Sequence, residues 1–297
     1  MKIIVTGSLG HISKPLTEEL VQRGHTVIVV SSNTERQKEI EAIGATAAIG
    51  TVADVEFLTS TFTGADAVYT MVPPGNYFDT GLDVIAACRA IGNNYAEAIR
   101  QSGVKRVVHL SSVGAHLEKG SGLILGHHAV EGVLNKLPNV AITFMRPVGF
   151  YYNLYSFIPV IKNTGVIAAN YGADENLVWV SPVDIAAAVA EELQASPGSK
   201  VRYVASDELT GNQTATILGE AIGKPDLKWI LIPGEEWLRR LEAAGMNPQI
   251  AVGLVEMFES QNKGILTEDY YRNRPAALGK VKLVDFAKEF AVTFNQK

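Results

Sequence analysis

Residues 3–13 read Ile-Ile-Val-Thr-Gly-Ser-Leu-Gly-His-Ile-Ser, and this stretch decides the fold of the chain. The apolar segment Lys2–Thr6 predicts a strand that ends in a turn containing Gly7 and Gly10. A helix from about His11 to Arg23 should follow, with its partly positive N-terminus and its free amide groups directed at the turn. A strand, a glycine-rich turn and a helix in this order are typical of a site for a dinucleotide pyrophosphate.

The third glycine of the usual G-x-x-G-x-x-G spacing is absent, because Ser13 stands in its place. Two glycines alone are also compatible with a strand-to-helix turn that binds no ligand. A predicted second strand, His25–Val30, follows at the spacing of a βαβ unit and favours the ligand-binding interpretation. The cofactor contacts expected from the turn are Thr6, Gly7, Leu9, Gly10, His11 and Ile12.

The first half of the chain alternates between short apolar segments and amphipathic ones, which predicts strands and helices in turn. The predicted strands are Lys2–Thr6, Thr26–Val30, Thr46–Ile49, Ala67–Met71, Arg106–Leu110 and Ala141–Met145. The predicted helices are Ile12–Arg23, Glu35–Ala42, Val55–Phe62, a long one near Tyr77–Ser102, and His127–Lys136. Most strands are nearly continuous in apolar character, as in a sheet covered on both faces. The pattern predicts an α/β fold, a Rossmann-type doubly wound parallel sheet.

The pattern loosens after Pro147, and we expect a smaller, mostly helical C-terminal lobe. The expected division is a Rossmann domain that binds NAD(P) over residues 1–150 and a substrate or partner lobe over 151–297. Some segments of about 176–205 should return to the Rossmann sheet, with Val201–Ala205 joining its edge. Other segments predicted here are helices at Tyr151–Val160, Pro182–Gln194, Thr210–Ile222, Glu235–Ala244, Pro248–Asn262 and Leu283–Phe294, and strands at Asn176–Val180 and Lys228–Ile232. Ligands are expected in the cleft between the lobes.

The composition narrows the class of protein. A formal charge of −5 and the absence of long basic runs argue against nucleic-acid binding. Cys88 is the single cysteine, which excludes an internal disulfide and suits a reducing cytoplasm. No apolar run approaches the roughly 18–20 residues of a membrane span, and the first residues do not resemble a signal-peptide core. We expect a cytoplasmic protein with no nucleic-acid or membrane partner.

The residues after the second strand indicate which dinucleotide is bound. They are Ser31, Ser32 and Asn33, followed by Arg36, with no carboxylate before Glu35. A carboxylate would accept hydrogen bonds from a ribose diol, whereas hydroxyls, an amide and a guanidinium suit a 2′-phosphate. The alternative is that these residues simply cap the next helix, and both can hold. We expect NADP(H) to be preferred, with NAD(H) possible.

The ends of two further strands should also touch the cofactor. Val72 and Pro73 are expected beside the adenosine ribose, although Pro73-Pro74 is also a rigid loop opener. Ser111 and Ser112 are expected on the nicotinamide side, although Ser111 can equally be a strand-end hydroxyl bonded to backbone.

Several sequence blocks, in order and spacing, resemble the NmrA-like family of atypical short-chain dehydrogenases/reductases, and most closely its NAD(P)H:quinone oxidoreductase type 2 group. They span nearly the whole chain. The matching blocks are Val5-Thr6-Gly7-x-x-Gly10, the segment from Gly103 to Ser112, Gly126-His127-His128-Ala-Val-Glu131, Met145-Arg146-Pro147 with Tyr152-Asn153, Val180-Ser-Pro-Val-Asp184-Ile-Ala186 and Val284–Ala291. The resemblance implies a Rossmann domain, a preference for NADP(H) and a cleft for a small molecule.

The chain departs from the reductase pattern of that superfamily. The usual Tyr-x-x-x-Lys pair is missing, since the chain reads Gly122-Leu-Ile-Leu125 where the tyrosine belongs. His127 or His128 takes the place of the lysine, and His127 could bind the ribose or offer a proton near neutral pH. Another departure is Thr51, where relatives often carry an aspartate. The resemblance also places Pro147 at the cofactor.

Two functions therefore stay open. One is an NADPH-dependent reductase of a quinone or similar electron-poor substrate, with His127 and Tyr152 as catalytic candidates. Its substrate side would be lined by Tyr151, Tyr152 and Asn153. The other is a redox sensor that binds NADP(H) without chemistry and reports through a regulatory protein partner.

Each of these residues also has a structural interpretation. The two histidines can be a polar helix start, and Tyr151 and Tyr152 can be core aromatics. Arg146 can pair with a carboxylate, and Asp184 can cap or anchor its helix. No metal site is expected, because no carboxylate or cysteine lies near the histidines at ligand spacing.

Overall fold

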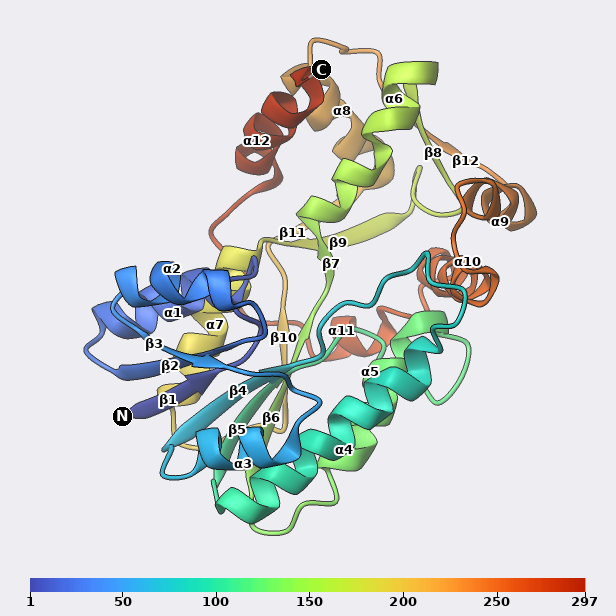
Figure 1. The fold of residues 1–297 in the computed structure, drawn as a ribbon. Coiled ribbons are helices and arrows are strands. Elements are labelled where there is room, and N and C mark those ends of the chain that lie inside the picture. Colours follow the sequence, from blue (N-terminus) through green and yellow to red (C-terminus); the bar gives the residue numbers. More distant parts are fainter. Residues whose placement is uncertain (297) are drawn as a thin grey trace.

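The computed structural model describes residues 1–296 and is built on a seven-stranded parallel sheet (Figure 1). Its strand order is β10-β6-β5-β4-β1-β2-β3. The strands are β1 (Lys2–Val5), β2 (Thr26–Ser31), β3 (Thr46–Ile49), β4 (Ala67–Met71), β5 (Arg106–Leu110), β6 (Ala141–Pro147) and β10 (Val201–Val204). The strand order reverses at β1, which lies between β2 and β4, so the predicted Rossmann-type α/β fold is confirmed.

Helices cover both faces of this sheet (Figure 1). One face carries α1 (Ser13–Gln22), α2 (Gln37–Ala42) and α7 (Pro182–Gln194). The other carries α3 (Val55–Phe62), α4 (Val84–Ser102) and α5 (Leu125–Leu134). Because apolar side chains meet both layers of helices, the central strand β1 buries Ile3, Ile4 and Val5 completely.

The second lobe contains strands as well as helices. A three-stranded sheet joins β7 (Gly149–Phe150), β9 (Asn176–Val180) and β11 (Asp207–Thr210), and β8 (Val166–Ala169) pairs with β12 (Lys228–Leu231). Its helices are α6 (Ile158–Thr164), α8 (Gly211–Ala221), α9 (Gly234–Ala243), α10 (Pro248–Asn262), α11 (Glu268–Arg272) and α12 (Leu283–Asn295). Residues 1–296 also form the 3-10 helices η1 (Thr34–Arg36), η2 (Gly122–Ile124) and η3 (Tyr151–Phe157).

Three predicted segments differ from the structure. The long helix α4 begins at Val84 instead of Tyr77, because residues 72–83 form a loop and the Asp83 carboxylate caps the helix by accepting from the Ala86 amide at 2.9 Å. The segment from Tyr151 to Val160 is η3 followed by the start of α6, not one helix. Of the stretch 176–205, β10 pairs with β6 at the sheet edge, whereas β9 pairs with β7 and β11 in the smaller sheet.

Asp184 ties the last part of the chain to the rest. Its carboxylate accepts hydrogen bonds from the amides of Lys280 at 3.0 Å and Val281 at 3.1 Å, and from the Ser206 hydroxyl at 2.6 Å. The expectation that Asp184 caps or anchors its own helix is therefore wrong, because Ser181 caps α7 by accepting from the Val183 amide at 3.2 Å and Asp184 anchors residues 280–281 instead. Within residues 1–296, no helix is both long and apolar enough to cross a membrane.

Candidate functional site

The glycine-rich turn lies at the carboxyl end of β1, where the strand order reverses. Gly7 has φ +92°, and a Cβ there would lie 2.7 Å from the Ser13 hydroxyl oxygen and 3.1 Å from Met71. That hydroxyl donates to the Thr6 carbonyl at 2.9 Å. Ser13 thus replaces the missing third glycine with a hydrogen bond that fixes the helix against the strand. Gly10 is exposed, so the turn leaves its backbone open to a ligand.

Two side chains of the turn point into the protein and not toward a ligand. The buried Thr6 hydroxyl accepts from the Met71 amide at 3.1 Å, and Ile12 packs in the core with 8% of its surface exposed. Their side chains are therefore unavailable, and only their backbones are left for a cofactor. His11 is exposed at the rim of the turn, and Leu9 is half-buried.

The residues after β2 are partly occupied by local hydrogen bonds. Ser31 is 2% exposed, and its hydroxyl accepts from the Ser8 hydroxyl at 2.9 Å and donates to the Asn33 carbonyl at 3.2 Å. The Asn33 side chain caps η1 by accepting from the Glu35 amide at 2.9 Å. The capping interpretation therefore holds for Asn33, and because the cap engages only the side-chain oxygen, the Nδ2 amide can still donate to a phosphate. Ser32 and Arg36 remain exposed.

A second cation lies near Arg36 and was missed by sequence reasoning. Glu39 on α2 accepts from Arg36 at 2.5 Å, and Lys14 on α1 lies 3.5 Å from the same carboxylate. Hydrogen bonding from Arg36, with the charge of Lys14, lowers the pKa of Glu39. Three helices, α1, η1 and α2, thus bring two cations and one anion together, and no local pattern in the sequence indicates this contact.

Ser111 belongs to a buried polar group with Glu131 and Arg146. Its hydroxyl is buried and donates to Glu131 at 2.5 Å. Arg146 completes this group with two hydrogen bonds to the Glu131 carboxylate, at 2.9 Å from Nε and 2.7 Å from Nη2. The Ser111 hydroxyl thus bonds to a side chain and not to backbone, and the expected contact of Ser111 with the cofactor stays a prediction, whereas the interpretation of Arg146 as half of an ion pair is confirmed. Ser112, just after the end of β5, is half-buried.

The ion pair continues toward the edge of the sheet. Nη1 of Arg146 lies 3.3 Å from Asp269 on α11 and 3.2 Å from the Tyr203 hydroxyl on β10, and that hydroxyl donates to Asp269. The network links α5, β6, β10 and α11 behind the end of β5. Because its charged groups are paired and hydrogen-bonded, it fixes the positions of these elements.

The two histidines of the Gly126–Glu131 block have different surroundings. His128 hydrogen-bonds through Nδ1 to the Ala115 carbonyl at 3.0 Å and holds the loop after β5. His127 is half-buried, and its Nδ1 is fully buried without a partner within the described residues. Burial lowers the pKa of His127, against the opposing charge of Glu131. A buried ring nitrogen that lacks a hydrogen-bond partner, near the carboxyl ends of the strands, is the kind of group to which a ligand can supply one.

The place of the usual reductase tyrosine is closed by packing. Gly122 has φ +52°, and a Cβ there would lie 1.8 Å from the Gly253 carbonyl oxygen of α10. Leu123 packs on the same turn of α10, since a Cβ at Gly253 would lie 2.7 Å from it. Helix α10 therefore fits against η2 only because both glycines lack side chains.

The two tyrosines after β7 have opposite environments. Tyr151 is 1% exposed, donates to Asp207 at 2.6 Å and stacks on Phe286 at 5.5 Å, so it belongs to the core and its expected role in lining the substrate is wrong. Tyr152 is half-buried and stacks on His11 of the glycine-rich turn, with ring centroids 4.8 Å apart. Asn153 is exposed next to it. Tyr152 therefore joins the second lobe to the turn.

The remaining predicted residues lie at the same sheet edge. Val72 is half-buried and Pro73 exposed after β4. Pro147 is buried at the end of β6, and its carbonyl accepts from the Val113 amide at 2.9 Å.

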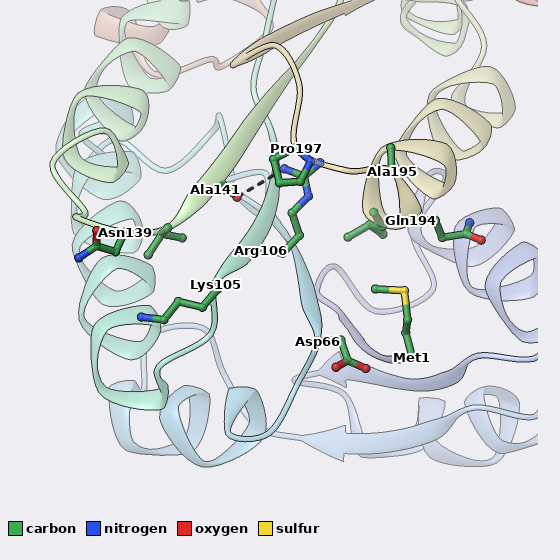
Figure 2. Close-up of a pocket in the computed structure, with 11 residues that line it drawn as sticks. Met1, Asp66, Lys105, Arg106, Asn139, Ala141, Gln194, Ala195 and Pro197 are labelled. Atoms are coloured by element: carbon green, nitrogen blue, oxygen red, sulfur yellow. Dashed lines mark hydrogen bonds between the residues drawn. The ribbon is translucent and has the colours of Figure 1, made fainter.

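A hollow of about 650 Å³ lies elsewhere, at the amino ends of the strands (Figure 2). Lys105, Arg106, Asp66 and Gln194 line it. The Arg106 guanidinium is already bonded to Thr143 at 2.9 Å and to Glu192 at 2.7 Å. The hollow is thus separate from the glycine-rich turn, which lies at the carboxyl ends. Residues 1–296 contain no group of three or more His, Cys, Asp or Glu side chains that could hold a metal ion.

The reversal of strand order, the glycine-rich turn and the helix N-terminus beside it define a nucleotide-binding protein of the Rossmann class. Residues 1–285 match the NmrA-like family, and the chain belongs to it.

Curated relatives cover nearly the whole chain at low identity. A (4-alkanoyl-5-oxo-2,5-dihydrofuran-3-yl)methyl phosphate reductase of Streptomyces griseus is 24% identical over 296 residues, covering 97% of this chain and 99% of the relative. An NAD(P)H azoreductase of Xenophilus azovorans is 24% identical over 302 residues, covering 99% of each chain.

Solved structures share the fold. The NADPH-dependent quinone oxidoreductase QOR2 of Escherichia coli, complexed with NADPH, has a TM-score of 0.81 at 20% identity, covering 97% of this chain and 99% of that one. A triphenylmethane reductase of Citrobacter sp., complexed with NADP(H), has a TM-score of 0.77 at 20% identity, covering 97% of this chain and 100% of that one.

Proposed function

We propose that this protein is an NADPH-dependent reductase of a quinone or a similar small, electron-poor acceptor. The observation that carries the proposal is the stack of Tyr152 on His11, because it brings an aromatic side chain of the second lobe onto the turn that would hold the cofactor. An acceptor and a nucleotide would thus meet at one sheet edge. The names of the relatives, which include an azoreductase and a quinone oxidoreductase, support the same class of reaction.

The residues present fit a dinucleotide. The backbone of Gly7, Leu9, Gly10, His11 and Ile12, with the N-terminus of α1, would hold the pyrophosphate, since the turn is open there and Gly7 tolerates no side chain. The half-buried ring of His127 would offer a contact on the nicotinamide side. Ser32, Arg36 and Lys14 would surround a 2′-phosphate, Val72 and Pro73 the adenosine ribose, and Ser112, His127 and Pro147 the nicotinamide.

In the proposed reaction the cofactor supplies the hydride and the protein supplies hydrogen-bond donors. When bound, a reduced nicotinamide supplies the hydride. Burial, with the nearby Tyr77, raises the pKa of Tyr152 to about 12, so its hydroxyl stays protonated and can donate a hydrogen bond to an acceptor oxygen. His127 is neutral at pH 7 because burial lowers its pKa, and it can donate from one ring nitrogen. An electron-poor acceptor needs only this modest stabilisation of a developing oxyanion.

The test is a steady-state assay without oxygen, in which NADPH or NADH is mixed with the protein and a panel of quinones. The expected result is loss of the reduced-nicotinamide absorbance with at least one quinone, and faster loss with NADPH than with NADH. A His127→Ala variant should lose part of its turnover or its cofactor affinity. If both are unchanged, His127 has no part in the site.

One observation favours a second candidate, a non-catalytic NADP(H) sensor that acts through a protein partner. Four residues before His127, where the usual proton-donating tyrosine would stand, the chain has Leu123, an apolar side chain packed against Gly253 of α10. Tight NADPH binding without turnover of any acceptor would support the sensor and refute the reductase.

A further inference from the structure

The loop between β4 and α4, residues 72–83, begins at the expected adenosine contacts and is shaped by short turns. The Asn76 side chain accepts from the Phe78 amide at 3.1 Å, and the Asp79 side chain accepts from the Gly81 amide at 2.9 Å. These bonds set the shape of the loop, but they connect residues only two positions apart. They therefore cannot decide where the loop lies relative to the second lobe.

Asn247, at the start of α10 in the second lobe, fixes that position. Its side-chain amide donates to the carbonyls of Asp79 at 2.8 Å and Leu82 at 3.2 Å, and its backbone amide donates to the Tyr77 carbonyl at 2.9 Å. Its side-chain oxygen caps α10 by accepting from the Gln249 amide at 2.9 Å. Asn247 is 2% exposed, so every polar group of this side chain is used inside the protein.

The helix that carries Asn247 is itself firmly placed. Gly253 packs on Gly122 so closely that a Cβ at Gly122 would overlap it. The Asn170 side chain also donates to the Val255 carbonyl at 3.1 Å. Because α10 is held by η2 on one side and by the second lobe on the other, Asn247 is a fixed point for the loop.

The loop brings Tyr77 toward the acceptor side of the site. Tyr77 is half-buried while its neighbour Phe78 is 56% exposed, so the loop turns Tyr77 inward. The nearby Tyr77 hydroxyl adds to burial in raising the pKa of Tyr152. Tyr152 in turn stacks on His11 at 4.8 Å and lies 5.0 Å from Phe150. The loop leaves the sheet at Val72, after β4, which pairs with β1 beside the turn that carries His11, so the position of the loop sets where Tyr77 lies at this edge.

We infer that Asn247 is a positioning residue for acceptor specificity, because it holds the 72–83 loop where Tyr77 and Tyr152 together admit a planar aromatic acceptor. The inference rests on the proposed reductase function and names its substrate class. Flat rings suit a site bounded by aromatic side chains, which offer large apolar faces and hydroxyl donors. Asn247 touches neither acceptor nor cofactor and acts through the loop.

The test uses Asn247→Asp in the full-length protein. The aspartate can still accept from the Gln249 amide and cap α10, but it cannot donate to the carbonyls of Asp79 and Leu82. Loss of two hydrogen bonds, with an oxygen now facing two carbonyls, should release the loop. The KM for a planar quinone should rise about tenfold, while kcat at saturating quinone and the Kd for NADPH stay within about twofold.

Two further variants separate positioning from misfolding. Asn247→Ser keeps a capping hydroxyl but lacks the amide donor, and it should show the same rise in KM. Gln249→Ala changes an exposed side chain on the same turn of α10 and should behave as wild type. Unchanged KM in both folded Asn247 variants overturns the inference, and so does a Kd for NADPH that rises in parallel with KM.

A binding measurement keeps the test independent of turnover. The Kd of the quinone is measured with protein saturated with NADP⁺, where no hydride is available. It should rise about tenfold in Asn247→Asp. Quinone binding without turnover in the wild type refutes the reductase and leaves the inference standing. Equal quinone binding by wild type and Asn247→Asp, or no binding of any planar acceptor by the wild type, overturns the inference.

Discussion

Ser13 stands where the nucleotide-binding motif usually has its third glycine, and it holds the helix against the strand by a hydrogen bond that glycine could not make. Its hydroxyl donates to the Thr6 carbonyl at 2.9 Å and occupies the space that a Cβ on Gly7 would need. The sequence predicted that a small residue would suffice here, and the structure adds the hydrogen bond. Gly7, in contrast, cannot be replaced, since both its φ of +92° and its neighbours exclude a side chain.

Arg36 is expected to decide the choice of cofactor. An Arg36→Ala variant should lose about tenfold in affinity for NADPH and less than about twofold for NADH, because only NADPH presents a 2′-phosphate to the guanidinium. Fluorescence titration with both nucleotides measures the difference.

A substitution of Glu39, beside Arg36, should change NADPH affinity in the opposite direction. Glu39→Gln removes the carboxylate that Arg36 and Lys14 share, so NADPH affinity should rise. Glu19→Gln, which alters the separate pair with Arg23, is the matched control and should leave both affinities unchanged. Equal losses of NADPH and NADH in Arg36→Ala would contradict the assignment.

His109 predicts how stability depends on pH. It is fully buried beside Thr70, and burial lowers its pKa from 6.5 to about 3. The unfolded chain therefore binds a proton below pH 6.5 that the folded protein refuses, so stability falls as the pH drops from 6.5 toward 3. Between pH 7 and 5 this amounts to about 2 kcal/mol.

The check is urea unfolding of wild type and His109→Leu at pH 7 and pH 5. The loss of unfolding free energy on acidification should be about 2 kcal/mol smaller in the variant, which has no imidazole to protonate. Identical losses in the two proteins would show that His109 is not held neutral by burial.

At the scale of elements, helices and strands of the second lobe are held by a few polar anchors. Asn247 joins α10 to the loop before α4, and the Glu131–Arg146–Asp269 network joins α5, β6 and α11. Asp184, at the start of α7, holds the segment that leads into α12.

Loss of the Asp184 anchor should be costly. Asp184→Ala leaves the amides of Lys280 and Val281 and the Ser206 hydroxyl without their acceptor, so the free energy of unfolding should fall by about 3 kcal/mol or more. Val183→Ala, at the adjacent and 52% exposed position, should cost less than about 1 kcal/mol. Urea unfolding compares them, and similar losses in the two variants would count against an anchoring role.

At the scale of the whole molecule, the sequence predicted the sheet better than the site. Most of the strands β1 to β6 are nearly continuous apolar runs, so their positions follow from local pattern. The short elements β7, β8, β11 and α11 were missed, because two to five residues carry little pattern and depend on distant partners.

The site, like the fold, has a part that the local sequence predicts and a part that it does not. The glycine-rich turn was predictable because its chemistry is local. The burial of Tyr151, the bond from Ser111 to Glu131 and the meeting of Lys14 with Glu39 each depend on residues far apart in the chain, which no local pattern reveals. The family resemblance, confirmed over residues 1–285, covered the fold but not these contacts.

The central claim is that the sheet edge at Gly7 and His127 holds NADPH for hydride transfer to a small acceptor. The most direct test is a single turnover without oxygen, in which protein saturated with NADPH is mixed rapidly with a quinone. The account predicts that the bound reduced nicotinamide is consumed in one phase, with one quinol formed per nucleotide, and that deuterium at the transferred position slows this phase. Saturable NADPH binding with no oxidation by any quinone would contradict it.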